Sequence, residues 1–185
     1  MTTATANSTA VSTWKIDPAH AAAQFRVKHM MISNVRGEFK GVDGLLSLDE
    51  ADGSRSRVEA TIDVSTVNTG EPQRDGHLKS PDFLDVEKFP AMSFRSTKVE
   101  KKMGDELAVT GDLTLHGVTR PVTFAVEGLS SPARDPWGNM RVGLTAAAKI
   151  NRKDFGLTWN SALETGGVLV GEEVAITLDV EFIKG

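Results

Sequence analysis

The 185-residue chain contains no cysteine, which excludes disulfide bonds and thiol catalysis and leaves the redox compartment open. It has no basic excess, because its net charge is −4, whereas proteins that bind nucleic acid usually carry a strongly positive surface. No run of about 18 consecutive apolar residues is present, so no transmembrane helix is predicted. These absences predict a soluble globular protein with no nucleic-acid partner and no membrane span.

The N-terminal stretch lacks the features of a targeting segment. Residues 1–12 are mostly Thr, Ala, Ser and Asn, with neither a cationic start nor an apolar run. A secretory signal peptide needs both. We therefore expect a disordered tail over residues 1–12, a single domain over residues 13–185 and a cytoplasmic location.

Motifs of enzymes and metal sites are also missing. The sequence has no G-x-S-x-G nucleophile motif and no Gly-rich phosphate loop after a strand. Its histidines show neither HxH nor HExxH spacing: His20, His29, His77 and His116. We expect no catalysis, no metal and no cofactor. The alternative enzyme reading is a hydrolase in which an Asp and a His meet at the mouth of the fold.

What is present is period-two alternation of apolar and polar residues, with helical periodicity almost absent. Residues 57–64 place Val58, Ala60, Ile62 and Val64 on one face. Residues 173–182 repeat the pattern, as do shorter stretches around Phe25, Phe94, Leu113 and Phe124. The pattern predicts about eight long strands separated by Gly-rich and Pro-rich turns.

Each strand has a single apolar face that must be covered by a second sheet, by helices or by closure of the sheet. Several alternating runs exceed the usual strand length of about five or six residues, and only one segment has helical features. The pattern therefore favours an all-β, extended antiparallel β-barrel with one short helical insertion. Isolated glycines in the strands predict the bulges or bends that closure requires: Gly37, Gly41, Gly111 and Gly143.

The helical insertion is predicted over residues 69–90. Pro72 suits the start of one helical turn, and Ser80-Pro81 suits the start of a second. Asp75 and Lys79 are spaced to pair on the first turn. We expect the insertion to lie across one end of the barrel.

Several motifs resemble the YceI-like family, in the order in which the family has them. They are Trp14 to His20, Phe25 to His29, Val35 to Phe39, Arg74 to Pro90, Gly111 to Val122 and Asn151 to Leu157. The resemblance covers nearly the whole chain from Trp14. It implies a lipocalin-like barrel that binds a polyisoprenoid or similar amphiphilic long-chain lipid in its lumen without catalysis, and it implies a homodimer. Many family members are periplasmic and carry a signal peptide, from which residues 1–12 depart.

The apolar strand faces supply the candidate lumen wall. The residues that we expect to contact the ligand are Phe25, Val27, Phe39, Val58, Ile62, Met92, Phe94, Leu113, Val122, Phe124, Leu144 and Ile176. The alternative is that these side chains fill a solid core, in which case the protein acts through its surface.

Two residues of the insertion are candidates for a polar headgroup. Arg74 and His77 are three residues apart on the first helical turn, so their side chains project together. Arg geometry and a titratable imidazole suit an anionic or polar group. The structural alternative is that Arg74 pairs with Asp75, Asp82 or Asp85 and that His77 caps a backbone carbonyl.

Two tryptophans in turn regions remain open to two interpretations. Trp137 and Trp159 are either exposed anchors for a partner or a second copy of the chain, or plugs at the ends of the barrel.

Overall fold

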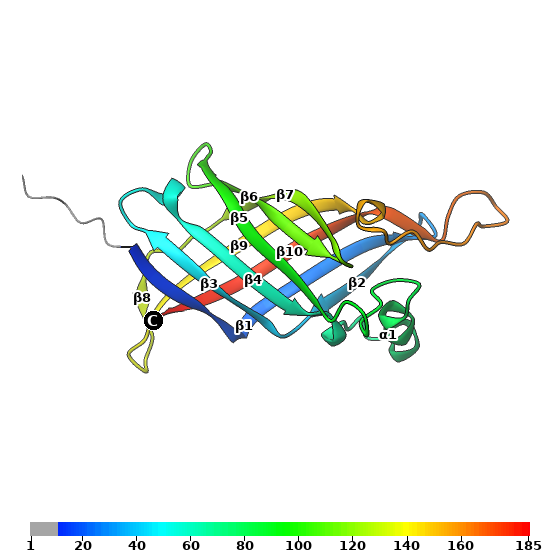
Figure 1. Cartoon of the computed structure of the whole chain (residues 1–185), viewed down its shortest axis with the longest axis horizontal. Coiled ribbons are helices and arrows are strands. Elements are labelled where there is room, and N and C mark those ends of the chain that lie inside the picture. The colour runs from blue at the N-terminus through cyan, green and yellow to red at the C-terminus, as the bar shows by residue number, and fades with distance from the viewer. Residues whose placement is uncertain (1–10) are drawn as a thin grey trace, which may run out of the picture.

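Ten strands and one short α-helix make up residues 11–185, the part of the chain that the computed structural model describes (Figure 1). The strands are β1 (Val11–His29), β2 (Ser33–Phe39), β3 (Val42–Asp49), β4 (Arg57–Asp63), β5 (Ala91–Lys101), β6 (Leu107–Leu115), β7 (Val118–Glu127), β8 (Ala133–Arg134), β9 (Met140–Asn151) and β10 (Val170–Lys184). The helix is α1 (Pro72–Lys79), and the short 3-10 turns are η1 (Gly53–Arg55), η2 (Val64–Thr66) and η3 (Arg152–Phe155). Residues 1–10 of the predicted tail lie outside the described part, whereas Val11 and Ser12 begin β1.

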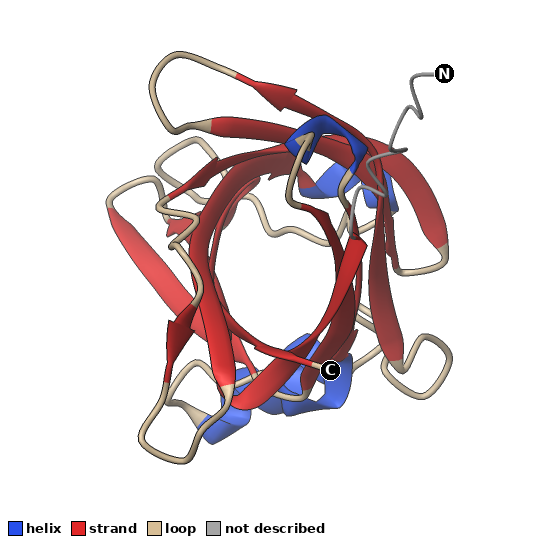
Figure 2. Ribbon diagram, turned by 90° about the vertical axis from the view of Figure 1, so that its left-hand side faces the viewer, coloured by secondary structure: helices blue, strands red, loops and turns tan. Residues whose placement is uncertain are grey.

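The sheet closes into an antiparallel barrel of eight strands, which confirms the predicted fold class. The ring runs β10, β1, β3, β4, β5, β6, β7, β9, and β9 pairs with β10 to complete it. Seen along the barrel axis, the strands form a closed ring (Figure 2). The remaining strands are additions to the ring, because β2 pairs with β1 and the two-residue β8 pairs with β9.

The longest strand, β1, has different neighbours along its two halves. Residues 11–15 pair with β3, and residues 23–29 pair with β2. Between β2 and β3 the chain bends at Gly41, whose φ of 68° is the left-handed conformation that glycine tolerates. On its other edge β1 pairs with β10, with a shift of register between Ile16 and Ala21. The hairpin of β1 and β2 therefore extends past the ring at one end.

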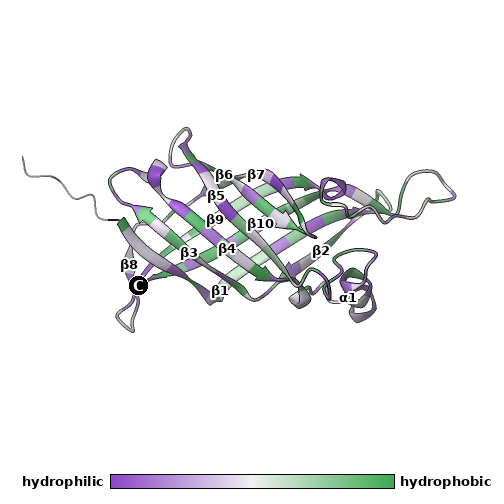
Figure 3. Cartoon of the chain, viewed as in Figure 1, coloured by the Kyte–Doolittle hydropathy of each residue, from purple (hydrophilic) through white to green (hydrophobic). Residues whose placement is uncertain are grey.

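Apolar and polar residues alternate along the ring strands, as the bands of hydropathy in Figure 3 show. The apolar side chains are the buried ones and point inward, and the polar side chains point outward. The largest fully buried side chains are Trp14 and Val142 on ring strands and Val64 and Phe155 in the turns η2 and η3. Because each strand has one buried face, the core lies inside the barrel.

The insertion between β4 and β5 contains one helix, and the second predicted helical turn is wrong. The helix α1 begins at Pro72, as expected, and the Glu71 side chain accepts hydrogen bonds from the first turn. After Ser80 the chain forms hydrogen-bonded turns that carry the buried Phe83 and Leu84 to the barrel. The insertion lies at the end where the β1–β2 turn and residues 156–169 are found, here called the α1 end (Figure 1).

The expected pairing of Asp75 with Lys79 is also wrong. The Asp75 carboxylate instead accepts hydrogen bonds from the backbone and the hydroxyl of Thr69, at 2.9 and 2.5 Å. A short polar side chain near a helix start is more readily satisfied by nearby backbone donors than by a flexible lysine. Among residues 11–185, no helix is long and apolar enough to cross a bilayer.

The predicted glycine bends differ in their outcome. Gly111 lies opposite a register shift in β5 between Ser96 and Lys98, which is a bulge. A Cβ at Gly111 would lie 2.4 Å from the carbonyl oxygen of Arg95. Gly143 lies in regular pairing with Glu181, so a bulge at that position is wrong.

We predict that Gly111→Ala lowers the free energy of unfolding by about 1–3 kcal/mol, because backbone atoms of β5 must move to admit the methyl group. Gly143→Ala is the matched control, since its Cβ would meet its nearest atom at 3.7 Å, and it should change the value by less than about 0.5 kcal/mol. Urea unfolding followed by circular dichroism measures both. Equal losses for the two variants would contradict the role given to Gly111.

Candidate ligand-binding cavity

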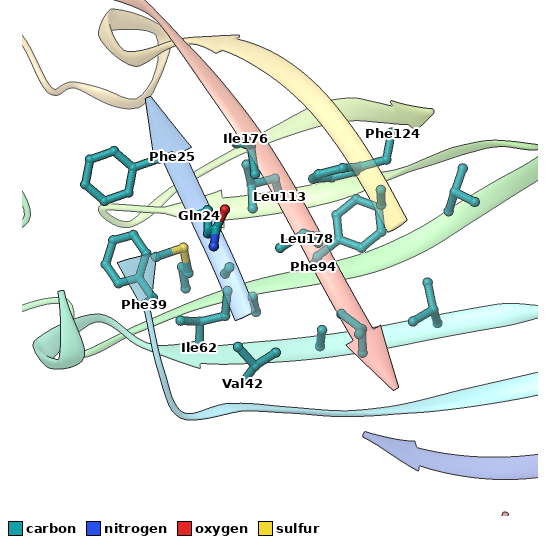
Figure 4. A pocket seen from close by; sticks show the side chains of 18 of the residues that line it. Gln24, Phe25, Phe39, Val42, Ile62, Phe94, Leu113, Phe124, Ile176 and Leu178 are labelled. Atoms are coloured by element: carbon teal, nitrogen blue, oxygen red, sulfur yellow. The ribbon is translucent and has the colours of Figure 1, made fainter. Parts of the chain in front are cut away.

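An apolar cavity of about 300 Å³ lies inside the barrel. Its wall is formed by inward-facing residues of the eight ring strands, together with Leu78, Phe83 and Leu84 of the insertion. Figure 4 shows phenylalanine and aliphatic side chains from several strands converging on this space. The polar residues of the lining are Gln24, Ser56, Arg57, Ser93 and Arg152. The volume is at the lower end of that of small-molecule sites, which is roughly 300–1,000 Å³.

The structure brings together all but one of the residues predicted for the lumen wall. Those that line the cavity are Phe25, Val27, Phe39, Val58, Ile62, Met92, Phe94, Leu113, Phe124, Leu144 and Ile176. Val122 does not line it, although it alternates in phase with Phe124. Val122 is packed in the core beside the cavity, because inward orientation along a strand does not by itself give contact with an empty space. Contact of the others with a ligand stays a prediction.

The cavity is elongated along the barrel. Its lining residues on β10 run from Val170 to Phe182, which corresponds to about 40 Å of strand at the usual rise of about 3.3 Å per residue. A typical strand tilt of about 40° reduces this to about 30 Å along the axis. At the α1 end the lining includes Leu157 and Phe83, and at the opposite end it includes Leu48 and Leu129. A long, narrow space of this shape suits a chain-like molecule.

Aromatic pairs line the cavity at two levels. Phe25 and Phe39 have ring centroids 5.5 Å apart near the α1 end. Further along, Phe94 and Phe124 meet edge to face at 5.1 Å. Such tilted arrangements are the favoured geometries of aromatic pairs, so the rings form firm parts of the wall.

Arg152 is a cavity residue that the sequence did not single out. It is 4% exposed, and its guanidinium donates hydrogen bonds to the carbonyl oxygens of Gly171 at 2.8 Å and Trp159 at 2.9 Å. It also donates to the carbonyls of Leu157 and Val170. Burial lowers the pKa of Arg152, and the charge of Glu172 acts in the opposite direction. Arg152 thus fastens the segment that follows η3 to the start of β10.

The signal for Arg152 in the sequence was weak. It stands between Asn151 and Lys153 in a polar stretch, where a cation is ordinarily exposed. Only its place in the motif Asn151 to Leu157 marked it. The carbonyls that hold it come from residues up to 19 positions away, and that convergence is a property of the folded chain.

Arg74 and His77 are not part of the cavity lining. Arg74 donates through Nε to the Thr69 hydroxyl at 2.8 Å and through Nη2 to the Thr69 carbonyl at 2.9 Å, rather than pairing with an aspartate. His77 lies 2.9 Å from Asp82 through Nε2, rather than capping a carbonyl. Both side chains therefore order the insertion, which favours the structural alternative over contact with a headgroup.

The two tryptophans have different environments. Trp159 is half-buried and packs against His77 and Phe83, with ring centroids 4.8 and 5.1 Å apart. It holds the insertion against the segment after η3, which agrees with a plug at the end of the barrel. Trp137, in the turn between β8 and β9, is 80% exposed. Its role as an anchor for a partner stays a prediction.

A charged cluster lies on the outer surface around Arg141. The guanidinium donates to Asp135 and Asp17 at 2.7 Å each and to Glu181 at 3.0 Å. These bonds hold the pKa of Asp135 well below its usual range and lower that of Asp17 to about 2, with His20 contributing to the second shift. The same carboxylates raise the pKa of Arg141.

Part of this cluster has the residue types of a metal site, but the Arg141 guanidinium already neutralises its carboxylates. Ligand atoms of Asp17, His20 and Glu181 lie within 4.8 Å of one another. The guanidinium of Arg141 already bridges Asp17 and Glu181, so a metal ion would have to compete with its positive charge.

Residues 11–185 contain two Asp–His pairs, which bear on the hydrolase alternative. They are Asp17 with His20 and Asp82 with His77, each 2.9 Å apart. Within the described residues, neither imidazole has a hydrogen bond to a Ser or Thr hydroxyl, which a nucleophile and its base would share. The absence of catalysis stays a prediction.

The chain is similar in sequence to known proteins over nearly its whole length. The model of the YceI-like domain matches residues 14–182. A protein called YceI from Salmonella newport is 45% identical over 182 residues, which are 97% of this chain and 91% of the relative. YceI proteins of other Salmonella, including Salmonella arizonae, match to the same extent.

Several solved structures have folds similar to this barrel. The crystal structure of a Campylobacter jejuni YCEI protein has a TM-score of 0.71 at 30% identity, over 85% of this chain and 90% of that one. BcnA of Burkholderia cenocepacia has a TM-score of 0.75 at 23% identity, over 90% and 98%. A polyisoprenoid binding domain from Saccharophagus degradans has a TM-score of 0.65 at 15% identity, over 95% and 100%. The last two show likeness of fold alone.

We predict that Arg152→Lys lowers the free energy of unfolding by about 2–4 kcal/mol, because an ammonium group cannot satisfy four divergent carbonyls. Arg120→Lys is the matched control, since the exposed Arg120 reaches a single carbonyl, that of Asp154, at 3.3 Å. It should cost less than about 0.5 kcal/mol. Urea unfolding compares the two, and a similar small loss in both variants would be inconsistent with the anchoring role of Arg152.

The Arg141 cluster predicts an acid-sensitive contribution to stability. Because the pKa of Asp17 falls from 3.8 to about 2 in the folded state, its contribution is complete above pH 3.8 and is lost as the pH drops toward 2. Arg141→Met should have a Tm lower by a few degrees at pH 7, with the difference from the parent narrowing across this window. Differential scanning calorimetry measures the profile. Arg95→Met, which breaks an exposed pair with Glu59, is the control, and its Tm should change with pH as that of the parent does. A constant difference in Tm between Arg141→Met and the parent across this pH range would disprove the acid-sensitive role of the Arg141 cluster.

Proposed function

The chain belongs to the YceI-like family, and from this premise we propose that its barrel carries an amphiphilic long-chain lipid, a polyisoprenoid, in its lumen without converting it chemically. The observation that carries the proposal is the elongated apolar cavity within the barrel. The likeness to a polyisoprenoid binding domain agrees with it at the level of the fold. Residues 13–185 then act as one carrier domain.

The shape and chemistry of the cavity support a linear apolar guest. Aliphatic and phenyl side chains form nearly all of its wall, and the space follows the barrel axis for much of its length. A compact or strongly polar ligand would leave much of this wall without a partner. A linear run of isoprene units, each with one methyl branch, presents an apolar surface along its whole length.

Burial alone can supply the affinity of such a guest. About ten buried methylene groups contribute on the order of 8 kcal/mol, which before the cost of ordering corresponds to a micromolar dissociation constant. This term depends little on which carbon chain is bound. Selection among lipids must then come from the width of the cavity at its aromatic pairs and from the polar groups at its ends.

The proposed contacts are the predicted lumen residues that line the cavity, with Val122 omitted. Arg74 and His77 act through the order of the insertion, since Thr69 and Asp82 already engage them. A cavity of this size disfavours the alternative of a filled barrel that works only through its surface. The cytoplasmic location and the homodimer remain predictions from the sequence.

The first experiment identifies the guest. The purified protein is examined by native mass spectrometry and then extracted with organic solvent for lipid analysis. We expect an added mass that matches a polyprenyl compound and that disappears after extraction. A protein that carries no lipid, and that binds no added polyprenol of any chain length, would contradict the proposal.

We predict that Ala146→Phe lowers the affinity for polyprenols at least about tenfold, because Ala146 lines the cavity and the phenyl ring would occupy the path of the chain. Ala147→Phe is the matched control on the same strand, because Ala147 is exposed on the outer face. Titration with polyprenols of graded length measures the affinity, and thermal unfolding shows that each variant is folded. If both variants bind as the parent does, the guest does not occupy the lumen.

A further inference from the structure

The turn between β1 and β2 presents apolar side chains to solvent at the α1 end of the barrel (Figure 1). Met30, Met31 and Ile32 are 40, 56 and 80% exposed. They are consecutive and occupy the tip of a hairpin that extends past the closed ring. Exposed apolar side chains grouped in this way mark a contact surface more often than isolated ones do.

Local structure does not account for these residues. The amide of Ile32 donates to the His29 carbonyl at 3.1 Å, which closes a tight turn with Met30 and Met31 at its centre. Their φ angles are 51° and 62°, a left-handed conformation that Asn and Gly adopt far more readily than methionine. The tip therefore holds two flexible apolar side chains in backbone positions that disfavour them.

A basic surface begins directly behind the tip. Arg26 of β1 lies opposite Arg36 of β2, and Lys28 follows on the same outer face. Like charges placed directly opposite each other on neighbouring strands repel. Within residues 11–185 none of these three cations forms an ion pair, so no close carboxylate in this part of the chain offsets the repulsion.

The acidic residues nearby do not cancel this charge. Glu172 and Glu173, at the start of β10, are paired with Lys153 and Lys149. Glu164, in the neighbouring segment 156–169, is an exposed carboxylate. On the hairpin itself, Glu38 of β2 lies 3.9 Å from Lys40, and it is outnumbered there by Arg26, Lys28 and Arg36. The balance at the hairpin remains positive.

We propose that this hairpin docks the protein on a lipid bilayer with anionic headgroups. The side chains of residues 30–32 insert among the acyl chains, and Arg26, Lys28 and Arg36 meet the phosphates above them. Apolar side chains flanked by basic ones are the pattern of surfaces that lie in the membrane interface. Anionic headgroups would relieve the repulsion between the two arginines.

Docking in this way would bring one end of the cavity to the membrane. Val27 and Phe25, on the strand that leads to the tip, both line the cavity. Transfer of a lumenal lipid between bilayer and barrel rests on the proposed function. Docking on the membrane does not depend on that function. Vesicles that contain no polyisoprenoid therefore test docking separately.

The test compares tip and control variants in flotation assays with vesicles of equal parts phosphatidylglycerol and phosphatidylcholine. Met30→Asn combined with Met31→Gly should lower vesicle binding about tenfold or more, while stability stays the same or rises because these residues suit the turn. Met103→Ser is the control, since Met103 is 93% exposed in the turn between β5 and β6, at the opposite end. It should bind as the parent does.

The charge contribution is separated by Arg26→Gln combined with Arg36→Gln. This variant should lose about tenfold or more of its binding to the anionic vesicles, and added salt should weaken the parent in the same direction. Vesicles of phosphatidylcholine alone should bind the parent weakly and the variant to the same degree.

Insertion of the tip has a direct readout, because the chain contains no cysteine and a single one can be labelled. Ile32→Cys carrying a polarity-sensitive dye should shift its emission to the blue on the anionic vesicles, whereas Met103→Cys should not. Unchanged binding of the tip double variant, or an equal response of both dyes, overturns the proposal. Polyprenol titration of the tip variants in the absence of vesicles should give the parent affinity, so a failure of docking is distinguished from a failure of lumenal binding.

Discussion

Closure of the sheet is the interaction on which the rest of this structure depends. Every ring strand has one apolar face, and the single α-helix, which has no buried residue, cannot cover those faces. Pairing of β10 with both β1 and β9 turns all of them toward one axis. An interior lined on all sides by side chains follows from this, and the phenylalanines occupy only part of it. The cavity is therefore a direct result of the topology rather than of any particular side chain.

Most of the fold and of the cavity wall could be predicted from the alternation of apolar and polar residues. Strand parity placed Phe25, Ile62 and Leu144 in the lumen wall, because a strand repeats every second residue whatever lies beyond it. The resemblance in family motifs supplied the ligand class, which alternation alone does not reach. Parity could not separate Val122, in the packed core, from Phe124 at the cavity, since that depends on how neighbouring strands fill the space.

Contacts between distant parts of the chain were the part that could not be predicted. Arg152 looked like an ordinary surface cation, and only the folded chain brings the carbonyls of Trp159 and Gly171 to it. The partners of Arg74 and Asp75 were misjudged for a related reason. Charge suggested ion pairs, whereas Thr69 lay closer once the insertion had folded. The exposure of the apolar residues 30–32 could not be predicted either, because the sequence does not show whether a short apolar turn is covered by another segment.

Two segments meet at the α1 end: residues 156–169, which follow η3, and the insertion between β4 and β5. Different interactions hold each of them in place. The segment after η3 is tied to β10 through a buried guanidinium, so moving it would expose an unsatisfied cation and several carbonyls. The insertion is held chiefly by aromatic stacking on Trp159 and by apolar contacts, while its polar bonds at Arg74 and His77 are internal and survive if it moves as a body. Displacing the first segment would therefore break hydrogen bonds to a buried charge, whereas displacing the insertion would mainly expose apolar and aromatic surface.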